Sequence, residues 1–416
     1  MNTDVAIVGA GAAGLATAIF AARRHPDWSL VALDGARQIG AKILVSGGGR
    51  CNVTNRRVTP GDFFGGNPNV LRRVFAAFPV EHTVAFFAEL GVPLHEEEDG
   101  KLFPDTNRAR SVVAALLDEA ARRGVAIQTA QRVNAIERGA DGFDVTVERR
   151  ADASRAQHVL HARNVVLATG GLSLPKTGSD GAGYDLARKL GHTLVPTTPG
   201  LAPFVLDGDF HVGLSGVAQE VELTIRTAPL KPTRLRGPML WTHFGVSGPV
   251  ALNASRFWHR ANLEQRAVTL TVNFLPGDDL AAAERRLLNL ATDQPRTALR
   301  NALAGLLPAR LADSLLAQLG IGGQIAMAQL ARDHRRRLVH ALLEWPLPVR
   351  DSRGYAFAEV TAGGVPLAEV DPATMGSRIC PGLHLVGEIL DVDGRIGGFN
   401  FQWAWSSAWV AAAGLV

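Results

Sequence analysis

The sequence has few cysteines, few lysines and no long apolar run. Cys51 and Cys380 are its two cysteines, and they form no Cys-x-x-Cys pair. This excludes a disulfide framework and the usual zinc motifs. No apolar stretch reaches the roughly 18 residues of a candidate membrane span, and no basic segment followed by an apolar one marks a secretion signal. We therefore expect a cytoplasmic protein that holds no metal and contacts no membrane.

Charge of one sign is also scarce. The chain has 43 basic and 39 acidic residues among 416, a formal net charge of +4. Lysine occurs only five times, so arginine carries nearly all of the positive charge. We expect no DNA partner, whereas an arginine-rich surface can still bind RNA phosphates. The length, with 47% hydrophobic residues, predicts a globular protein of two or three domains.

The clearest motif stands at the start of the chain. An apolar run of strand length meets the spacing Gly9-x-Gly11-x-x-Gly14 and passes directly into an alanine-rich helical pattern. This context is typical of a dinucleotide-binding turn and makes a chance glycine triplet the weaker interpretation. A second apolar run ends at Asp34, 20 residues after Gly14, where a carboxylate can bind ribose hydroxyls.

A second glycine-rich segment follows at residues 40–55. It contains three consecutive glycines near Ser46, Arg50 and Asn52. Glycine disfavours helix and strand interiors by roughly 0.5–1 kcal/mol per residue, so the segment predicts a loop that passes close to a ligand. Lys42 and Arg50 would place positive charge beside a pyrophosphate or a flavin ring. A flexible surface turn with solvated cations is the alternative, but the position soon after the dinucleotide strand favours ligand binding.

Two further segments can touch a dinucleotide. An apolar strand-like run ends in small residues at Ala168, Thr169 and Gly170, and Val133 lies in another predicted strand, near the adenine. No second complete glycine fingerprint occurs in the chain. We therefore do not expect a separate NAD(P)H-binding domain.

The texture of the chain changes in its middle third. Short strands punctuated by proline and glycine predict a small β domain over residues 193–275 and 340–354. The Ala/Leu/Arg-rich stretch between them predicts a helical domain over residues 276–339. Residues 1–192 and 355–416 are then left to form the dinucleotide-binding domain.

The middle third also contains one candidate catalytic residue and one candidate RNA-binding cluster. His243 lies in a glycine-dense segment of the predicted β domain, although a single histidine is more often structural than catalytic. Arg332 and Arg335 to Arg337 cluster in the helical segment, where they can contact RNA phosphates or simply form a solvated helix face.

The end of the chain returns to the opening pattern. A strand-like run ends at Gly387 and Glu388, whose carboxylate would suit a ribityl hydroxyl. Gly398, Phe399 and Asn400 then open a final helix. The free N–H groups and the dipole of such a helix start can stabilise negative charge on a reduced flavin ring. An ordinary C-terminal helix explains the tryptophans there but not the glycines.

Residues 41–55, 241–249 and 387–400 resemble the corresponding motifs of the HI0933-like flavoproteins. This bacterial family is often labelled NAD(P)/FAD-dependent or "aminoacetone oxidase family" oxidoreductases, and the resemblance spans essentially the whole chain. It implies an α/β fold: a glutathione-reductase-type Rossmann domain that binds FAD non-covalently, interrupted by a small barrel-like β domain and a helical domain. Asp34 departs from the family, where a glutamate is usual, so its ribose contact is less certain.

The motifs and the resemblance together define the predicted cofactor-binding residues. They come from the opening fingerprint, the glycine-rich loop, the small-residue turns and the two C-terminal motifs. They are Gly9, Ala10, Gly11, Ala13, Gly14, Asp34, Lys42, Ser46, Gly49, Arg50, Cys51, Asn52, Val133, Ala168, Thr169, Gly170, Gly387, Glu388, Gly398, Phe399 and Asn400.

The resemblance implies reduction of carbon–carbon double bonds by reduced flavin, on steroid-like enones or on uracil in ribosomal RNA. The leading hypothesis is an FAD-dependent reductase of a small conjugated substrate, with NAD(P)H as transient co-substrate. Cys51, His243 and Tyr184 are the candidate proton donors. The alternatives are a flavin-dependent RNA-modifying enzyme and a non-catalytic flavin-binding interaction protein.

Overall fold

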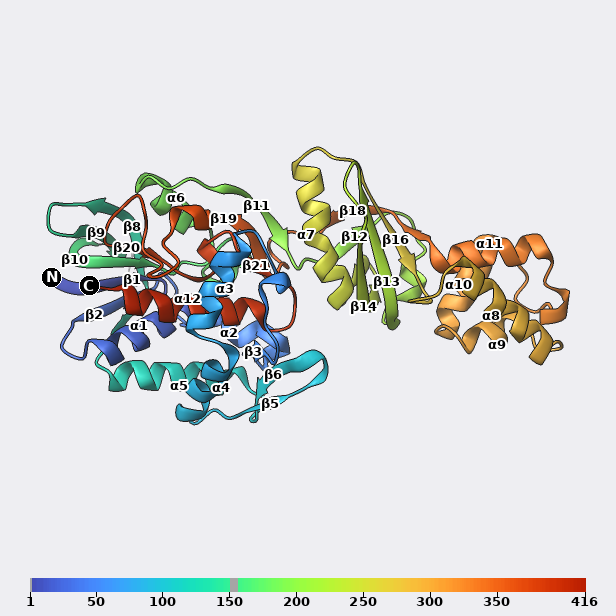
Figure 1. Ribbon diagram of the computed structural model, residues 1–416, viewed down its shortest axis with the longest axis horizontal. Coiled ribbons are helices and arrows are strands. Elements are labelled where there is room, and N and C mark those ends of the chain that lie inside the picture. The colour runs from blue at the N-terminus through green and yellow to red at the C-terminus, as the bar shows by residue number, and fades with distance from the viewer. Residues whose placement is uncertain (1, 150–155) are drawn as a thin grey trace. The chain divides into compact units, whose positions relative to one another are not determined.

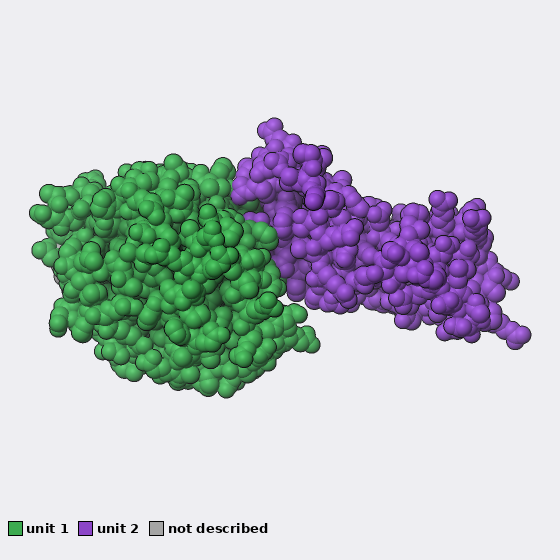
Figure 2. Space-filling view, in the orientation of Figure 1, with its two compact units in different colours: residues 1–199, 359–416 green, residues 200–358 purple. Residues whose placement is uncertain are grey.

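The computed structural model describes residues 2–149 and 156–416. The chain forms two compact units, shown in two colours in Figure 2. The first unit comprises residues 1–199 and 359–416, and the second comprises residues 200–358. The first unit is thus built from both ends of the chain, and the second is inserted between them. None of the helices in the described ranges is long and apolar enough to cross a membrane.

A seven-stranded sheet forms the centre of the first unit (Figure 1). Its strand order is β7-β2-β1-β10-β9-β8, and β20 pairs with the free edge of the last part of β10. β1, β2, β7, β10 and β20 run parallel, while β8 and β9 are antiparallel additions. The strands are β1 (Asn2–Val8), β2 (Leu30–Leu33), β7 (Ala126–Gln128), β8 (Gln131–Arg138), β9 (Phe143–Arg149), β10 (Gln157–Leu167) and β20 (Leu383–Leu385).

The burial of these strands explains their order. Every residue of β2 and of β20 is buried, as is the second half of β1. Continuous apolar runs suit parallel strands that are covered on both faces. In β9, buried and partly exposed residues alternate, which is the pattern of an antiparallel strand with one covered face.

The carboxyl ends of the central strands meet at one edge of the sheet. The N–H of Gly9 donates to the carbonyl of Leu33 at 2.8 Å, and the N–H of Ala168 donates to that of Val8 at 2.9 Å. The N–H of Val386 donates to the carbonyl of Leu167 at 3.0 Å. Three segments far apart in the sequence are therefore joined here, at the edge where open α/β sheets bind ligands.

Helix α12 (Phe399–Gly414) packs lengthwise against α1 (Ala12–Arg24), as Figure 1 shows. Its tryptophans also hold loops of the strand-end edge. The indole N–H of Trp403 donates to the carbonyl of Gly387 at 3.0 Å, and that of Trp405 donates to the carbonyl of Val53 at 2.9 Å. Both indoles are almost fully buried, so each polar N–H has the partner that burial requires.

The other elements of the first unit surround this sheet and its edge. They are α2 (Ala41–Val45), β3 (Thr54–Asn55), β4 (Phe63–Phe64), α3 (Pro68–Ala77), α4 (Val80–Glu89), β5 (Leu94–Glu96), β6 (Lys101–Pro104), α5 (Ala109–Arg122), α6 (Ala182–Lys189), β11 (Val195–Gly200), β19 (Val360–Gly364) and β21 (Asp393–Gly394).

The second unit contains a seven-stranded antiparallel sheet with the order β17-β16-β13-β14-β15-β12-β18. β17 and β18 are consecutive in the chain, yet they stand at opposite ends of this order. One bent segment therefore pairs with both edges of the sheet. The strands are β12 (Phe204–Leu206), β13 (Ala218–Thr227), β14 (Thr233–Thr242), β15 (Gly245–Ser247), β16 (Val268–Asn273), β17 (Trp345–Leu347) and β18 (Val349–Ser352).

Helices of the second unit share one hydrophobic core with its sheet. α7 packs on β13 and β14, and buried leucines of the later helices join buried residues of the sheet in one cluster. Amphipathic helices rich in leucine and alanine need such a surface to bury their apolar faces. The helices are α7 (Pro249–Leu263), α8 (Leu280–Asp293), α9 (Leu299–Ala304), α10 (Ala309–Leu319) and α11 (Arg332–Leu343).

Candidate cofactor-binding and active site

The opening glycines form an open cradle at the end of β1. Gly9 has a left-handed φ of +99°, and a Cβ added there would lie 2.5 Å from the carbonyl oxygen of Ala168. A Cβ on Gly14 would lie 1.9 Å from the carbonyl oxygen of Gly9. Neither position tolerates a side chain, because β1, α1 and the end of β10 approach too closely.

Gly11 differs from these two glycines. A Cβ on Gly11 would meet nothing within 4 Å, and Gly11 is the N-cap of α1 with no side-chain cap. The first N–H groups of α1 therefore start beside open space, where the helix dipole attracts an anion. A pyrophosphate fits this cradle, and a side chain on Gly11 would fill it.

Asp34 ties the cradle to the end of β2. Its Oδ2 accepts a hydrogen bond from the N–H of Ala10 and its Oδ1 accepts one from the N–H of Ala36, both at 2.8 Å. A carboxylate has further lone pairs, so hydroxyl groups of a ribose can still bind. The ribose contact of Asp34 stays a prediction, as does the adenine contact of Val133, which is buried in β8.

An ion-paired network lies at the same edge of the sheet. The ammonium of Lys42 contacts Glu388 and lies 2.5 Å from Oγ of Ser173. That hydroxyl is 2.6 Å from Oε1 of Glu388, which also accepts from the N–H of Thr361 at 2.9 Å. The Lys42 and Glu388 side chains are 25% and 17% exposed. Lys42 and Glu388 were predicted from the sequence as separate cofactor residues, and the structure brings them together.

Two members of this network were missed in the sequence. Ser173 and Thr361 are both fully buried, and the Oγ1 of Thr361 accepts hydrogen bonds from the N–H groups of Leu172 and Ser173. Ser173 stands shortly after the small-residue turn at Gly170. This position is the one feature of the sequence that could have marked it as a site residue. Thr361 carries no motif of its own.

Glu359 is a further functional candidate that carries no sequence motif. It directly precedes β19, and its side chain is open to solvent. The surrounding protein nevertheless raises the pKa of its carboxyl, because desolvation outweighs the attraction of Lys42. A carboxyl with a raised pKa holds its proton to higher pH and can act as an acid.

The glycine run within residues 40–55 is irregular, as predicted, but the ends of the segment are not, since α2 (Ala41–Val45) precedes the glycines and β3 (Thr54–Asn55) closes the segment. Gly47, Gly48 and Gly49 all have left-handed φ values, of +55°, +68° and +85°. Arg50 does not stand unpaired in this loop: its guanidinium lies 2.6 Å from Glu97 and stacks 4.1 Å from the Phe103 ring centroid. Its predicted cofactor contact stays untested, and part of its charge is already neutralised.

Asn52 offers a buried acceptor near the start of α12. Its Oδ1 is buried and has no hydrogen-bond partner among the described residues. A Cβ added to Gly398, the N-cap of α12, would lie 2.9 Å from this oxygen, and α12 has no side-chain cap. An unsatisfied buried carbonyl beside an uncapped helix start suits a heterocycle with both donors and acceptors, as a flavin has.

Other predicted cofactor side chains have structural partners. The Asn400 amide donates to the carbonyl of Gly394 at 3.0 Å and accepts from its N–H at 2.7 Å. Phe399 is fully buried in the core, and Oγ of Ser46 donates to the carbonyl of Ile43 at 2.7 Å. Their cofactor contacts stay predictions; the buried ring of Phe399 leaves only its backbone groups for a polar contact, whereas Asn400 and Ser46 keep further hydrogen-bonding capacity.

The three predicted proton donors come from both units: Cys51 and Tyr184 belong to the first and His243 to the second. Cys51 is fully buried, and burial raises the pKa of its thiol to about 12. Tyr184 is 4% exposed in the first turn of α6. His243 is exposed between β14 and β15 of the second unit, next to Phe244. Their catalytic roles stay predictions, and burial favours the neutral thiol of Cys51 over its thiolate.

These features agree with a match over nearly the whole chain. Residues 3–414 match the family model described as the HI0933-like protein Rossmann domain. The chain belongs to the HI0933-like family. This confirms the resemblance found in the sequence, and with it a Rossmann-type α/β fold and a flavin-dependent oxidoreductase.

Curated relatives of this HI0933-like chain cover almost all of it. It is 35% identical over 413 residues to the ribosomal RNA dihydrouridine synthase of Escherichia coli, covering 99% of this chain and 98% of the relative. It is 34% identical over 408 residues to the 3-dehydro-bile acid delta(4,6)-reductase of Clostridium scindens, covering 98% and 97%.

Solved structures share the fold of this HI0933-like chain at low identity. The 3-ketosteroid-delta4-(5alpha)-dehydrogenase of Rhodococcus jostii matches with a TM-score of 0.52 and 16% identity, covering 99% of this chain and 97% of that one. A quinol-fumarate reductase matches with a TM-score of 0.53 and 17% identity, covering 99% and 70%.

Proposed function

We propose that this protein is a cytoplasmic FAD-dependent reductase that saturates a conjugated carbon–carbon double bond, with NAD(P)H as electron donor. One observation supports double-bond reduction as the reaction. Two relatives that match this chain over almost their full lengths are named for different substrates, a uridine and a bile acid, but for the same kind of bond change. The bond change is therefore the shared property, and the substrate is what varies.

The described residues fit FAD at the strand-end edge of the first unit. The Gly11 cradle and the start of α1 would hold the pyrophosphate, and Asp34 the ribose. The Lys42–Ser173–Glu388 network, Asn52 and the start of α12 would hold the ribityl chain and the ring. Bound there, the flavin supplies hydride transfer to and from carbon. In this proposal residues 200–358 are the inserted barrel-like β domain with its helical domain.

Glu359 is the proton donor that we favour. Reduction of the double bond needs a proton at one carbon and a hydride at the other, so the acid must be protonated when substrate arrives. The raised pKa of Glu359 supports this state, and Lys42 would stabilise the carboxylate that remains after transfer. Cys51, with a pKa of about 12 in the core, holds its proton more tightly.

Uracil in ribosomal RNA is the second candidate substrate. The observation that favours it is the printed name of the Escherichia coli relative, a ribosomal RNA dihydrouridine synthase. A uracil ring contains a double bond conjugated to a carbonyl, so the same chemistry serves both substrate classes. The two candidate substrates differ in their surroundings: a uracil in ribosomal RNA brings a polynucleotide that must also be bound, whereas a small conjugated molecule does not.

An anaerobic absorbance titration with NADH and then NADPH tests the proposal. We expect one nucleotide to bleach the oxidised flavin band of the purified protein. A steroid-type enone or a uridine-containing RNA should then restore the band without oxygen. A yellow protein that neither nucleotide bleaches would contradict the NAD(P)H linkage. Bleached flavin that no conjugated alkene reoxidises would contradict the proposed reaction.

A further inference from the structure

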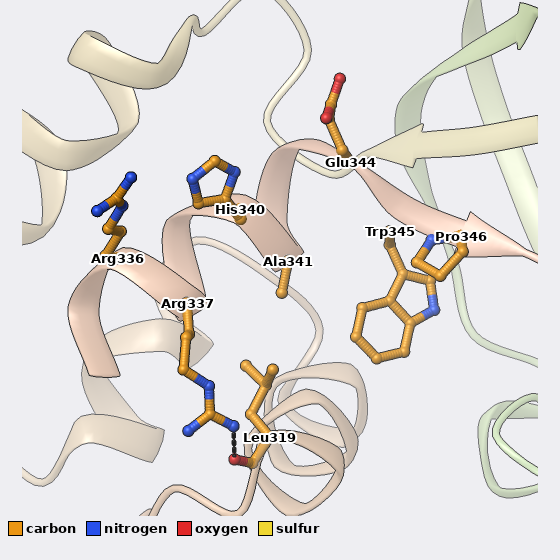
Figure 3. A pocket seen from close by; sticks show the side chains of 8 residues that line it. All are labelled: Leu319, Arg336, Arg337, His340, Ala341, Glu344, Trp345 and Pro346. Carbon is orange, nitrogen blue, oxygen red and sulfur yellow. Dashed lines mark hydrogen bonds between the residues drawn. The ribbon is translucent and has the colours of Figure 1, made fainter. Parts of the chain in front are cut away.

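An open groove lies on the second unit where α11 passes into β17 (Figure 3). Its volume is about 440 Å³. Arginine and histidine side chains of α11 lie on one side, and the indole of Trp345 lies on the other (Figure 3). The lining residues are Leu319, Arg336, Arg337, His340, Ala341, Glu344, Trp345 and Pro346.

The basic side chains of this groove are not all matched by acids. Within the described ranges, Arg336 has neither an ion pair nor a side-chain hydrogen bond, and it is exposed. Arg337 is exposed and donates to the carbonyl of Leu319 at 2.5 Å, which positions its charge without neutralising it. The carboxylate of Glu344 is paired at 2.8 Å with Arg226. The groove is therefore electropositive.

The surrounding helical segment strengthens this charge. Residues 276–346, which contain the whole lining of the groove, carry nine arginines and seven carboxylates, a formal charge of +2. A local excess of this kind attracts polyanions and speeds their encounter with the surface. The segment that supplies the groove is thus basic.

Trp345 adds a rigid aromatic face to the charge. Its ring centroid lies 4.5 Å from that of Phe210, with 35° between the planes. This packing holds the indole in place while the side chain stays partly exposed beside Pro346. A fixed indole next to arginines is the combination that binds single-stranded nucleic acid, because bases stack on the ring and phosphates meet the cations.

We propose that this groove binds a single-stranded segment of RNA, with a base on Trp345 and the adjoining phosphates at Arg336 and His340. An acidic peptide would satisfy the arginines but would leave the flat indole face without a role. The proposal rests on the proposed function only for the choice of uridine-rich RNA as the bound strand. Binding itself needs no turnover.

The test is the fluorescence anisotropy of a labelled oligouridine titrated with the purified holoenzyme at several salt concentrations. We expect Trp345→Ala to weaken binding about tenfold, the effect of losing one base–aromatic stack. Trp345→Phe should keep most of the affinity, because a phenyl ring can still stack and still contact Phe210. Arg336→Ala should weaken binding about threefold and reduce the slope of log affinity against log salt by about one.

Arg296→Ala is the matched control. Arg296 is exposed in the same helical segment but outside the groove, and its replacement removes the same charge. We expect it to leave RNA affinity within twofold. Equal losses in the Arg296 and Arg336 variants, or no loss in Trp345→Ala, would overturn the proposal and indicate general polyanion attraction. Absence of RNA binding by the wild type, or equally strong binding of polyglutamate, would overturn it as well.

The same preparations separate this proposal from the proposed function. Flavin bleaching by NAD(P)H and reoxidation by a steroid-type enone should be unchanged in all of these variants, since the groove belongs to a surface of the second unit. If the protein binds RNA at the groove but reduces no double bond, the RNA-binding proposal is supported and only the proposed reductase function is contradicted. If the protein reduces double bonds but its RNA affinity does not change with these substitutions, only the RNA-binding proposal is contradicted.

Discussion

The candidate site of the first unit and the groove of the second unit differ in how their cations are held, although other arginines near the groove are paired, such as Arg335 with Glu284. At the edge of the sheet in the first unit, cations are held by acids: Lys42 by Glu388 and Arg50 by Glu97. On the helical surface of the second unit, Arg336 has no such partner within the described ranges. Paired charges fix geometry, whereas unpaired charges remain available to a partner. Under our proposals, the paired charges of the first unit position a cofactor and the unpaired Arg336 attracts a polyanion.

The largest expected effect separates two glycines of one motif. Gly14→Ala should prevent stable FAD binding and lower the free energy of unfolding by about 3 kcal/mol, because its Cβ would meet the backbone of Gly9 at 1.9 Å. Gly11→Ala has free space around its Cβ, so the protein should unfold normally but bind FAD more weakly. Thermal unfolding and the ratio of flavin to protein absorbance measure both. Equal stability losses in the two variants would contradict this account of the cradle.

Glu359→Gln should affect one half-reaction and spare the other. Loss of a general acid is expected to slow alkene-dependent flavin reoxidation by on the order of 10²–10⁴-fold, while reduction by NAD(P)H keeps its rate. Stopped-flow absorbance resolves the two steps. Glu89→Gln, a surface carboxylate paired with Arg23 at 3.0 Å, is the matched control and should behave like the wild type.

The same residue predicts the pH dependence. Because the pKa of Glu359 is raised, its acid form persists above the range of an ordinary carboxyl. The wild-type reoxidation rate should be constant at low pH and fall as pH rises through that pKa. In Glu359→Gln this fall should disappear. A fall that persists unchanged in the variant would assign the titration to another group.

Lys42→Met tests the paired charges of the first unit. It leaves the mostly buried Glu388 without its cation, and we expect a loss of about 2 kcal/mol in the free energy of unfolding. Adding Glu388→Gln should restore part of this loss, because the unpaired charge is removed as well. Urea unfolding of both single variants and the double variant gives the coupling energy. If the losses of the two single variants simply add in the double variant, Lys42 and Glu388 do not stabilise each other.

The smallest effect is expected at an ordinary surface pair. Arg188 and Asp185 form an ion pair at 3.1 Å in α6, with side chains 59% and 71% exposed. Arg188→Ala should change the free energy of unfolding by less than about 0.5 kcal/mol. A large loss, measured by urea unfolding, would mean that exposure is a poor guide to which charges of the first unit position structure.

Much of the first unit could be predicted from local sequence. The spacing of Gly9, Gly11 and Gly14 predicted a close strand–helix approach and an open cradle, and the structure has both features. The prediction of an irregular loop over residues 40–55 is confirmed for the left-handed glycines and wrong for residues 41–45, which form α2. These features depend on neighbours within a few positions of the chain, so a short motif contains all the steric information that they need.

Partners of individual side chains could not be predicted in this way. The ribose contact predicted for Asp34 stays a prediction, but nothing in the sequence showed that its two oxygens also accept the N–H groups of Ala10 and Ala36. The cofactor contact predicted for Asn400 is likewise untested, and the sequence did not show that its amide bonds to the backbone of Gly394. Ser173, Thr361 and Glu359 stand in no recognisable spacing. Their environments come from segments that only folding brings together.

The sequence by itself determined the family, the Rossmann-type fold and the position of the dinucleotide cradle, because steric demands on the backbone are written in the spacing of a few glycines. The tertiary structure decided which charges are paired. Lys42 and Glu388 are 346 residues apart. The exposure of Arg336 likewise depends on how the second unit folds. Coulombic and hydrogen-bond energies depend on distance in space and on access to water, and neither quantity can be read along the chain.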